Sequence, residues 1–106
     1  MNDYLQGKIE SYCYMVKKGK PAAMISIQNR YVKEAIKKVK SLSNLKTIIE
    51  DTSKGWKVLW IYKYSHIEKV IKSSRQVPKT TFDHWVLGKL FGYSEEAIAD
   101  FINRLV

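Results

Sequence analysis

Four basic residues recur at a spacing that would place them on one face of a helix. Arg30, Lys33, Lys37 and Lys40 follow one another at intervals of 3, 4 and 3 residues, which is the repeat of neighbouring positions on an α-helix surface. A row of cations like this can contact the phosphates of a nucleic acid, and such binding weakens steeply with salt. The same row is also typical of the solvated face of an amphipathic helix, so the sequence leaves both interpretations open.

A second candidate is the segment of residues 56–64, in which aromatic side chains are interleaved with lysines. Its β-branched and aromatic residues predict a strand. Aromatic rings on a sheet can stack on bases while nearby ammonium groups hold phosphates. The residues expected to do so are Trp56, Lys57, Trp60, Tyr62 and Lys63. The alternative is that Trp60 and Tyr62 form a floor under the C-terminal helices, with Trp56 and Tyr64 exposed at the strand ends.

Carboxylates replace lysines in the last helix expected from the sequence, over residues 95–105. Together with a helix over residues 82–91, it resembles a helix-turn-helix motif in spacing alone. The matching positions are Leu87, Gly88, Phe91, Gly92, Tyr93, Ile98 and Phe101. Those are packing positions, and carboxylates on the helix that should enter the DNA groove would repel phosphates. The hairpin is therefore interpreted as structural or as a protein-binding surface that includes Glu95, Glu96 and Asp100.

The usual patterns of catalysis and metal binding are missing from the sequence. His66 is expected in the first turn of a helix, and His84 follows Asp83 on another, where adjacent residues point in different directions. No Cys/His cluster has the spacing of a metal site, and no glycine-rich phosphate-binding loop occurs. Cys13, the single cysteine, has no base close to it in sequence. We expect a binding protein that is not an enzyme and has no metal ion or cofactor.

The elements that would position these residues form a repeated pattern of two strands and a helix. Strands are predicted over residues 12–16 and 21–27, followed by a helix over residues 29–42 with Asn29 as its N-cap. The pattern recurs with strands over residues 45–51 and 56–64 and a helix over residues 65–73. Ser65 would cap this second helix, with Glu68 completing a capping box. Asn29 and Ser65 match at an offset of 36 residues.

The N-terminal segment allows a competing interpretation as one helix over residues 3–18. Five apolar residues fall at helical spacing there, namely Leu5, Ile9, Tyr12, Cys13 and Val16. We favour a short helix over residues 2–9 followed by the hairpin, because residues 12–16 are rich in strand formers.

The fold expected from this pattern is α+β: a four-stranded antiparallel sheet with both helices on one face, plus a C-terminal helical hairpin. Strand alternation assigns the two faces of the sheet. Ala23, Ile25, Leu59 and Ile61 are expected to face the helices, and Met24, Ser26, Val58, Trp60 and Tyr62 the opposite side. The hairpin would begin after Thr80 or Thr81 as a cap, turn at Gly92, and restart at Ser94.

Length and charge set the outer limits. The 106 residues suit a single domain, with a basic body over residues 1–76 and the hairpin over residues 77–106. Residues 1–79 hold 17 of the 19 Lys/Arg and 6 of the 10 Asp/Glu, so they carry +11 and the remainder −2. The basic excess predicts nucleic acid or an acidic protein surface as partner. A homodimer through an open sheet edge fits either partner.

Compartment is inferred from what the sequence lacks. A lone cysteine excludes an internal disulfide and suits a reducing compartment. No signal peptide pattern is present at the N-terminus, and the apolar runs are too short to span a bilayer. These features favour the cytoplasm and no membrane partner, with a host-cell cytoplasm expected if the protein is phage-encoded.

Residues 59–64 and 84–93 make the chain similar to short, lysine-rich proteins encoded by phages and mobile elements of low-GC Gram-positive bacteria. The resemblance implies a role in phage replication, host takeover or evasion of host defence, and no functional residue is carried over from it. Two functions remain open. The first is nucleic-acid binding through the basic helix face and the aromatic strand. The alternative is a protein-binding inhibitor or adaptor that acts on a larger complex.

Overall fold

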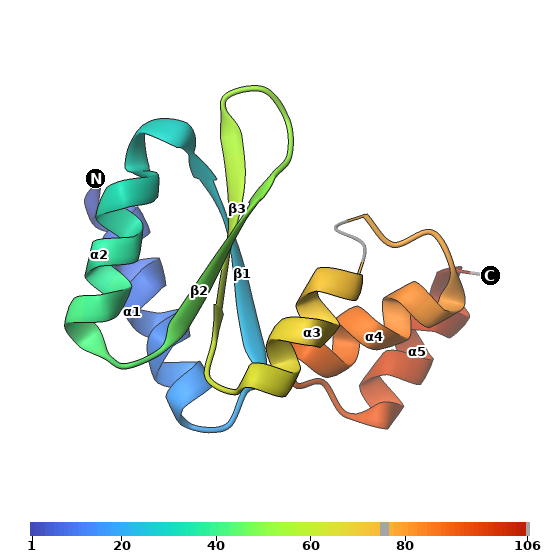
Figure 1. Cartoon of the computed structure of the whole chain (residues 1–106). Helices are drawn as coiled ribbons and strands as arrows, with labels where there is room; N and C mark the ends of the chain where they lie inside the picture. Colours follow the sequence, from blue (N-terminus) through green and yellow to red (C-terminus); the bar gives the residue numbers. More distant parts are fainter. Residues whose placement is uncertain (75–76, 106) are drawn as a thin grey trace.

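An antiparallel sheet of three strands lies at the centre of the structure (Figure 1). The structure is a computed structural model that describes residues 1–74 and 77–105. β1 (Ala22–Gln28) and β2 (Lys46–Asp51) flank β3 (Trp56–Tyr62), and each is antiparallel to it. β1 and β2 therefore run parallel to each other, and a helix between them makes the long crossover that parallel strands need. The α+β class is confirmed, but the expected fourth strand is absent from the described residues.

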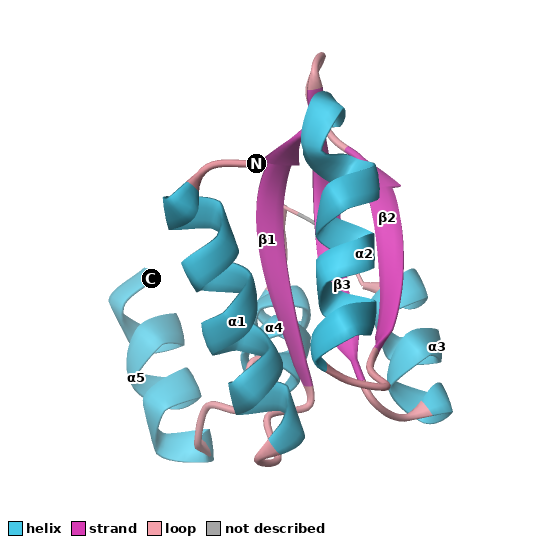
Figure 2. Ribbon diagram, turned by 90° about the vertical axis from the view of Figure 1, so that its left-hand side faces the viewer, coloured by secondary structure: helices cyan, strands magenta, loops and turns pink. Residues whose placement is uncertain are grey.

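Helices cover both faces of the sheet, which corrects the expectation that they share one. They are α1 (Asp3–Lys17), the 3₁₀ turn η1 (Asn29–Tyr31), α2 (Val32–Leu42), α3 (Ser65–Ser73), α4 (Thr81–Leu90) and α5 (Glu95–Leu105). α1 and α2 lie on one face, and α3 and α4 on the other (Figures 1 and 2). α5 packs against α4.

The strand predicted over residues 12–16 is wrong, because α1 continues through that segment to Lys17. The Asn2 side chain caps the helix by accepting a hydrogen bond from the Leu5 amide. At the other end Gly19 has a φ of 122°, and the amides of Gly19 and Lys20 donate to the carbonyls of Val16 and Met15. This is a Schellman termination, so the segment predicted as a hairpin turn ends a helix. The competing helical interpretation of residues 3–18 was the better one.

Two apolar cores form, one on each side of the sheet. Between the sheet and α1 and α2 lie residues of β1 and β3 that alternate along their strands, namely Ala23, Ile25, Ile27, Leu59 and Ile61. The opposite core contains Ala22, Val58, Trp60 and Tyr62 together with Ile71, Leu87 and Leu90 of α3 and α4. The predicted division of side chains between faces is therefore confirmed. The internal repeat fails because α2 and α3 lie on opposite faces.

Both predicted caps of the repeat are also wrong. Asn29 begins η1, and Tyr31 is the N-cap of α2 without a side-chain hydrogen bond. Ser65 is already inside α3, whose N-cap is Tyr64. The Ser65 hydroxyl instead accepts a hydrogen bond from Lys46, 3.0 Å away, and Glu68 pairs with Lys72 at 3.1 Å.

The C-terminal hairpin follows its sequence signals closely. Thr80 and Asp83 form a reciprocal capping box at the start of α4. Gly92, with a φ of 81°, ends the helix in a second Schellman arrangement, because the Tyr93 amide donates to the Gly88 carbonyl. The Ser94 hydroxyl accepts from the Ala97 amide at the start of α5.

Close packing of α4 and α5 predicts opposite effects for alanine at two helical glycines. A Cβ at Gly88 would lie 2.7 Å from Cγ1 and 2.9 Å from Cδ1 of Ile98. We expect Gly88→Ala to lower the free energy of unfolding by about 1–2 kcal/mol, since overpacking outweighs the helix propensity of alanine. At Gly7 in α1 nothing lies within 4 Å of the added carbon, so Gly7→Ala should raise it by about 0.5–1 kcal/mol. Urea unfolding compares the variants, and a stabilised Gly88→Ala would contradict the observed contact.

Candidate nucleic-acid interface

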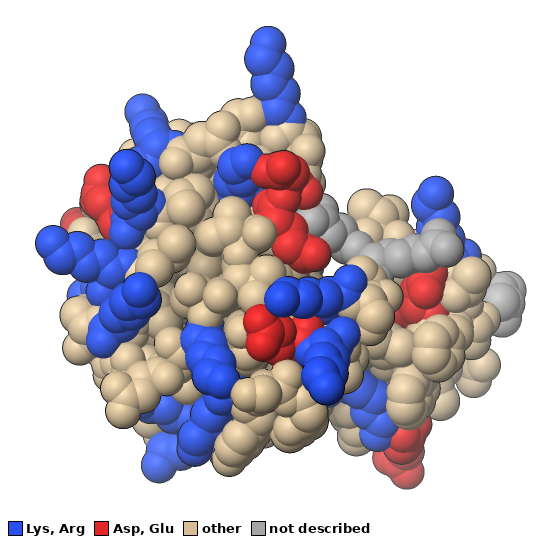
Figure 3. All heavy atoms as spheres, in the orientation of Figure 1, with Lys and Arg blue, Asp and Glu red and all other residues tan. Residues whose placement is uncertain are grey.

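The basic row predicted for the first long helix is present on α2. Ala35 and Val39 face the core, so the opposite side of the helix faces solvent. Lys33, Lys37 and Lys40 are exposed on that side. Lys and Arg side chains gather over α2 and around the lower end of the sheet (Figure 3). We call these three residues the α2 lysine row.

The carboxylates closest to this row are paired with other groups. Glu34 lies 2.9 Å from the amino-terminal ammonium of Met1, and Glu10 of α1 lies 3.0 Å from Lys38. The first pair joins α2 to the N-terminus and the second joins it to α1. None of the ion pairs in the described part of the chain includes a member of the α2 lysine row. The positive charge of the row is therefore not neutralised locally.

Arg30 lies beside the row and not on the same helix. It belongs to η1, the 3₁₀ turn that precedes α2. Its guanidinium lies over the Tyr31 ring, 4.7 Å from the ring centroid, in a cation–π arrangement. Arg30 is exposed, so it can extend the cationic surface beyond the N-terminal end of α2.

The aromatic strand is buried at its centre, which removes two predicted base-stacking residues from the surface. Trp60 is 0% exposed and Tyr62 is 3% exposed. The Trp60 ring stacks on Phe91 at 6.0 Å between centroids, and its indole N–H donates to Glu50 at 2.6 Å. Burial raises the pKa of Tyr62, and Glu68 contributes. The second interpretation of this strand holds in part: these rings form a floor under α3 and α4, while α5 of the predicted hairpin packs against α4.

Only the ends of the aromatic strand reach solvent. Trp56 is 41% exposed and Tyr64, just beyond the strand, 54%. Lys57 forms an ion pair with Asp51 on β2, and this carboxylate offsets the positive charge of Lys57. Lys63 is exposed, and its ammonium group lies 5.3 Å from the centroid of the Tyr64 ring. The exposed residues of the predicted interface therefore lie at the two opposite ends of the strand and do not form one continuous surface.

The acidic residues of α5 remain on the surface, but they are not equivalent. Glu95 accepts a hydrogen bond from the Trp85 indole at 3.1 Å and pairs with Lys89. The hydrogen bonds from Lys89 and then from Trp85 lower the pKa of Glu95. Its first role is therefore to join α5 to α4. Glu96 and Asp100 are exposed one turn apart.

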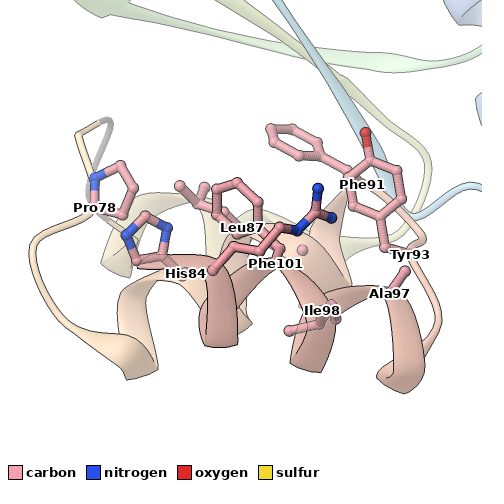
Figure 4. A pocket seen from close by; sticks show the side chains of 10 residues that line it. Pro78, His84, Leu87, Phe91, Tyr93, Ala97, Ile98 and Phe101 are labelled. Atoms are coloured by element: carbon pink, nitrogen blue, oxygen red, sulfur yellow. The ribbon is translucent and has the colours of Figure 1, made fainter. Parts of the chain in front are cut away.

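An apolar pocket of about 500 Å³ lies between α4 and α5 (Figure 4). The rings of His84 and Phe101 meet edge to face at its one end, 5.4 Å apart. Phe91 and Tyr93 lie towards the other end. Arg104 of α5 also lines the pocket, so a cationic side chain borders its apolar walls.

Sequence reasoning missed a smaller, basic pocket of about 250 Å³. It lies where the turn between α1 and β1 meets the junction between β3 and α3. Lys17, Lys20, Lys63, Tyr64 and His66 are among its lining residues. The two segments are more than 40 residues apart in the chain, and no local motif joins them. To predict that these two segments meet, one would have to know that α1 ends at Lys17, in the segment that the sequence predicted as a hairpin turn.

The described residues contain no group of three or more His, Cys, Asp or Glu side chains that could hold a metal ion. Cys13 is buried in the core. Its burial raises the pKa of the thiol, although Lys17 partly opposes the effect, and a protonated buried thiol is a poor nucleophile.

Comparisons with known proteins add no family. No family model matches the chain, and a search of curated proteins finds no similar sequence. Among the helices of residues 1–74 and 77–105, none has the length and apolar character needed to cross a bilayer.

Proposed function

We propose that this chain is a small, non-enzymatic nucleic-acid-binding protein whose main contact surface is the α2 lysine row. The observation that carries the proposal is the exposure of Lys33, Lys37 and Lys40 together with the absence of carboxylate partners for them among the described residues. A cation without a local partner gains most from a phosphate, because binding releases the counterions of the nucleic acid.

The dimensions of the row suit a phosphate backbone. Lys33 and Lys40 are seven residues apart, which is about 10 Å along an α-helix. Charges on one nucleic acid strand repeat at about 3.4 Å along the helix axis, so the row spans several phosphates. Arg30 extends the surface at one end. These contacts position a backbone and do not read sequence, so the proposed binding has little base specificity.

A salt titration of the wild-type protein tests this proposal. We expect fluorescence anisotropy with labelled duplex DNA to give an affinity that falls about 40-fold between 50 and 200 mM salt, at about 3.5-fold for each of three phosphate contacts. Labelled single-stranded DNA and RNA of equal length show which nucleic acid is preferred. An affinity that does not change over this salt range contradicts the proposal.

A second candidate function, binding of a protein partner through the C-terminal hairpin, is favoured by the pocket of Figure 4. Phe101 is 48% exposed at its rim, and exposed apolar side chains beside a pocket are typical of interaction sites. Co-purification with and without nuclease treatment separates the two functions. A partner that survives nuclease treatment and is lost in Phe101→Ala supports the protein-binding function.

A further inference from the structure

We propose that the basic pocket between the α1–β1 turn and the β3–α3 junction binds the terminal phosphate of a nucleic acid strand, with the terminal base against Tyr64. This inference rests on the proposed function, because it assigns a second, more specific contact to the same ligand. It concerns a strand end, which the α2 lysine row does not distinguish from any other part of the backbone.

The first argument is charge. Lys17, Lys20 and Lys63 line the pocket, and no Asp or Glu does. None of the three forms an ion pair within residues 1–74 and 77–105. The Lys17 ammonium donates a hydrogen bond to the Leu42 carbonyl, 3.1 Å away. A concave site with charge of one sign raises the local concentration of anions.

The position of these ammonium groups is set by rings and carbonyls and not by carboxylates. The Lys20 ammonium lies 5.6 Å from the ring centroid of Tyr12 and 5.8 Å from that of Phe91. Glu68, on the first turn of α3, is held by Lys72, and hydrogen bonding from Lys72 lowers its pKa. The pocket therefore keeps its positive charge although α3 carries an acidic residue close by.

The second argument is the start of α3 at the pocket wall. Tyr64 is the N-cap of this helix, and its side chain makes no capping hydrogen bond to the first turn. The first amides of a helix point outward from its end and favour a negative charge there. His66, in the same turn, also lines the pocket. A phosphate bound by the lysines would thus meet amide donors as well as ammonium groups.

The third argument concerns the base. The Tyr64 ring is 54% exposed and is stacked on His66, with 5.7 Å between centroids and 16° between planes. A stacked pair of rings beside a phosphate site is a platform for an unpaired base, since bases stack on aromatic side chains in single-stranded complexes. The volume of about 250 Å³ lies below the roughly 300–1,000 Å³ of small-molecule pockets, which suits a phosphate group with its base outside against Tyr64 and excludes a duplex.

Two titrations test the proposal. In the first, a nucleoside 5′-monophosphate is added to isotope-labelled protein and amide shifts are followed by NMR. We expect saturable shifts at Gly19, Lys20, Ser65 and His66, with no shifts at Lys33, Lys37 and Lys40. Inorganic phosphate should give the same pattern at several-fold lower affinity, because it lacks the base. Shifts confined to α2, or none at millimolar ligand, overturn the proposal.

In the second titration, single strands with a 5′-phosphate and with a 5′-hydroxyl are compared by anisotropy. We expect the phosphorylated strand to bind about tenfold more tightly, as one additional charge-assisted site would give. The preference should disappear in Lys17→Gln/Lys63→Gln and persist in Lys54→Gln/Lys69→Gln, which removes the same charge elsewhere. Tyr64→Ala should weaken binding of the mononucleotide, and Tyr64→Phe should restore it.

The outcomes separate this inference from the proposed function. Equal affinity for both strands, with salt-sensitive binding retained, overturns the pocket and leaves the α2 lysine row in place. Weak binding of all strands, with mononucleotide shifts at the pocket, overturns both the proposed function and the strand-end role, and leaves a mononucleotide site alone. If Tyr64→Ala binds the mononucleotide as well as the wild type does, the stacking role of Tyr64 is wrong.

Discussion

Reversing the charge of the whole α2 lysine row is expected to reduce nucleic-acid affinity by about 100-fold at 50 mM salt. The triple variant Lys33→Glu/Lys37→Glu/Lys40→Glu removes three phosphate contacts and replaces them with repulsion. It should also reduce the slope of log affinity against log salt by about 3, because each lost phosphate contact lowers the slope by about 1. Anisotropy with duplex DNA at several salt concentrations measures both quantities.

The matched control for this variant is Lys54→Glu/Lys69→Glu/Lys79→Glu. It changes the net charge by the same amount at three exposed lysines outside α2. Comparable losses in the two variants would mean that the general basic charge drives binding and that α2 has no special role. Circular dichroism should show both variants folded, since Lys and Glu have similar helix propensities. The end effect of Glu at position 40 costs only about 0.3–1 kcal/mol.

The parts of the fold that sequence predicted well are those in which local signals and burial agree. Thr80, Gly92 and Ser94 cap and end α4 and α5 as expected, because each acts within a few residues of its own position. The strand alternation that separates Leu59 from Trp60 depends only on the period of two along β3, and it is reproduced in the two cores.

The N-terminal helix shows where local propensity misleads. Residues 12–16 are rich in strand formers, but Ile9, Cys13 and Val16 are buried together along one side of α1. Burial of a helical stripe therefore outweighs the weak preference of tyrosine and valine for strands. The apparent repeat depends on that hairpin, and it treats Asn29 and Ser65 as equivalent helix starts. In the structure the chain crosses to opposite faces of the sheet after these two residues.

The candidate site divides in the same way. The α2 lysine row could be predicted because its members lie on a single helix. The burial of Trp60 could not be predicted, since whether a strand face is covered depends on where α3 and α4 pack. The basic pocket could not be predicted for the same reason. Lys17 and Lys63 line one pocket because β1 pairs with β3, which brings the two segments together.

Truncation of the buried tryptophan is expected to have the largest effect on stability. Trp60→Ala should lower the free energy of unfolding by about 3–5 kcal/mol, the usual cost of removing a large buried aromatic side chain. That is a large part of the 5–15 kcal/mol typical of a domain. The variant loses the contact with Phe91 and leaves Glu50 without the indole donor. Urea unfolding followed by circular dichroism measures the loss.

Trp56→Ala is the matched control, because it removes the same side chain from the exposed end of the same strand. It should cost no more than about 1 kcal/mol, and equal losses in the two variants would contradict the proposed floor.

The position of β3 predicts a second effect of Trp60→Ala, on hydrogen exchange. Leu59 and Ile61 of this central strand belong to the core under α1 and α2, while Trp60 belongs to the core under α3 and α4. Because one strand carries both cores, amide hydrogen exchange should accelerate in α1 as well as in α4. Acceleration confined to α3, α4 and α5 would show instead that these helices leave the sheet as an independent unit.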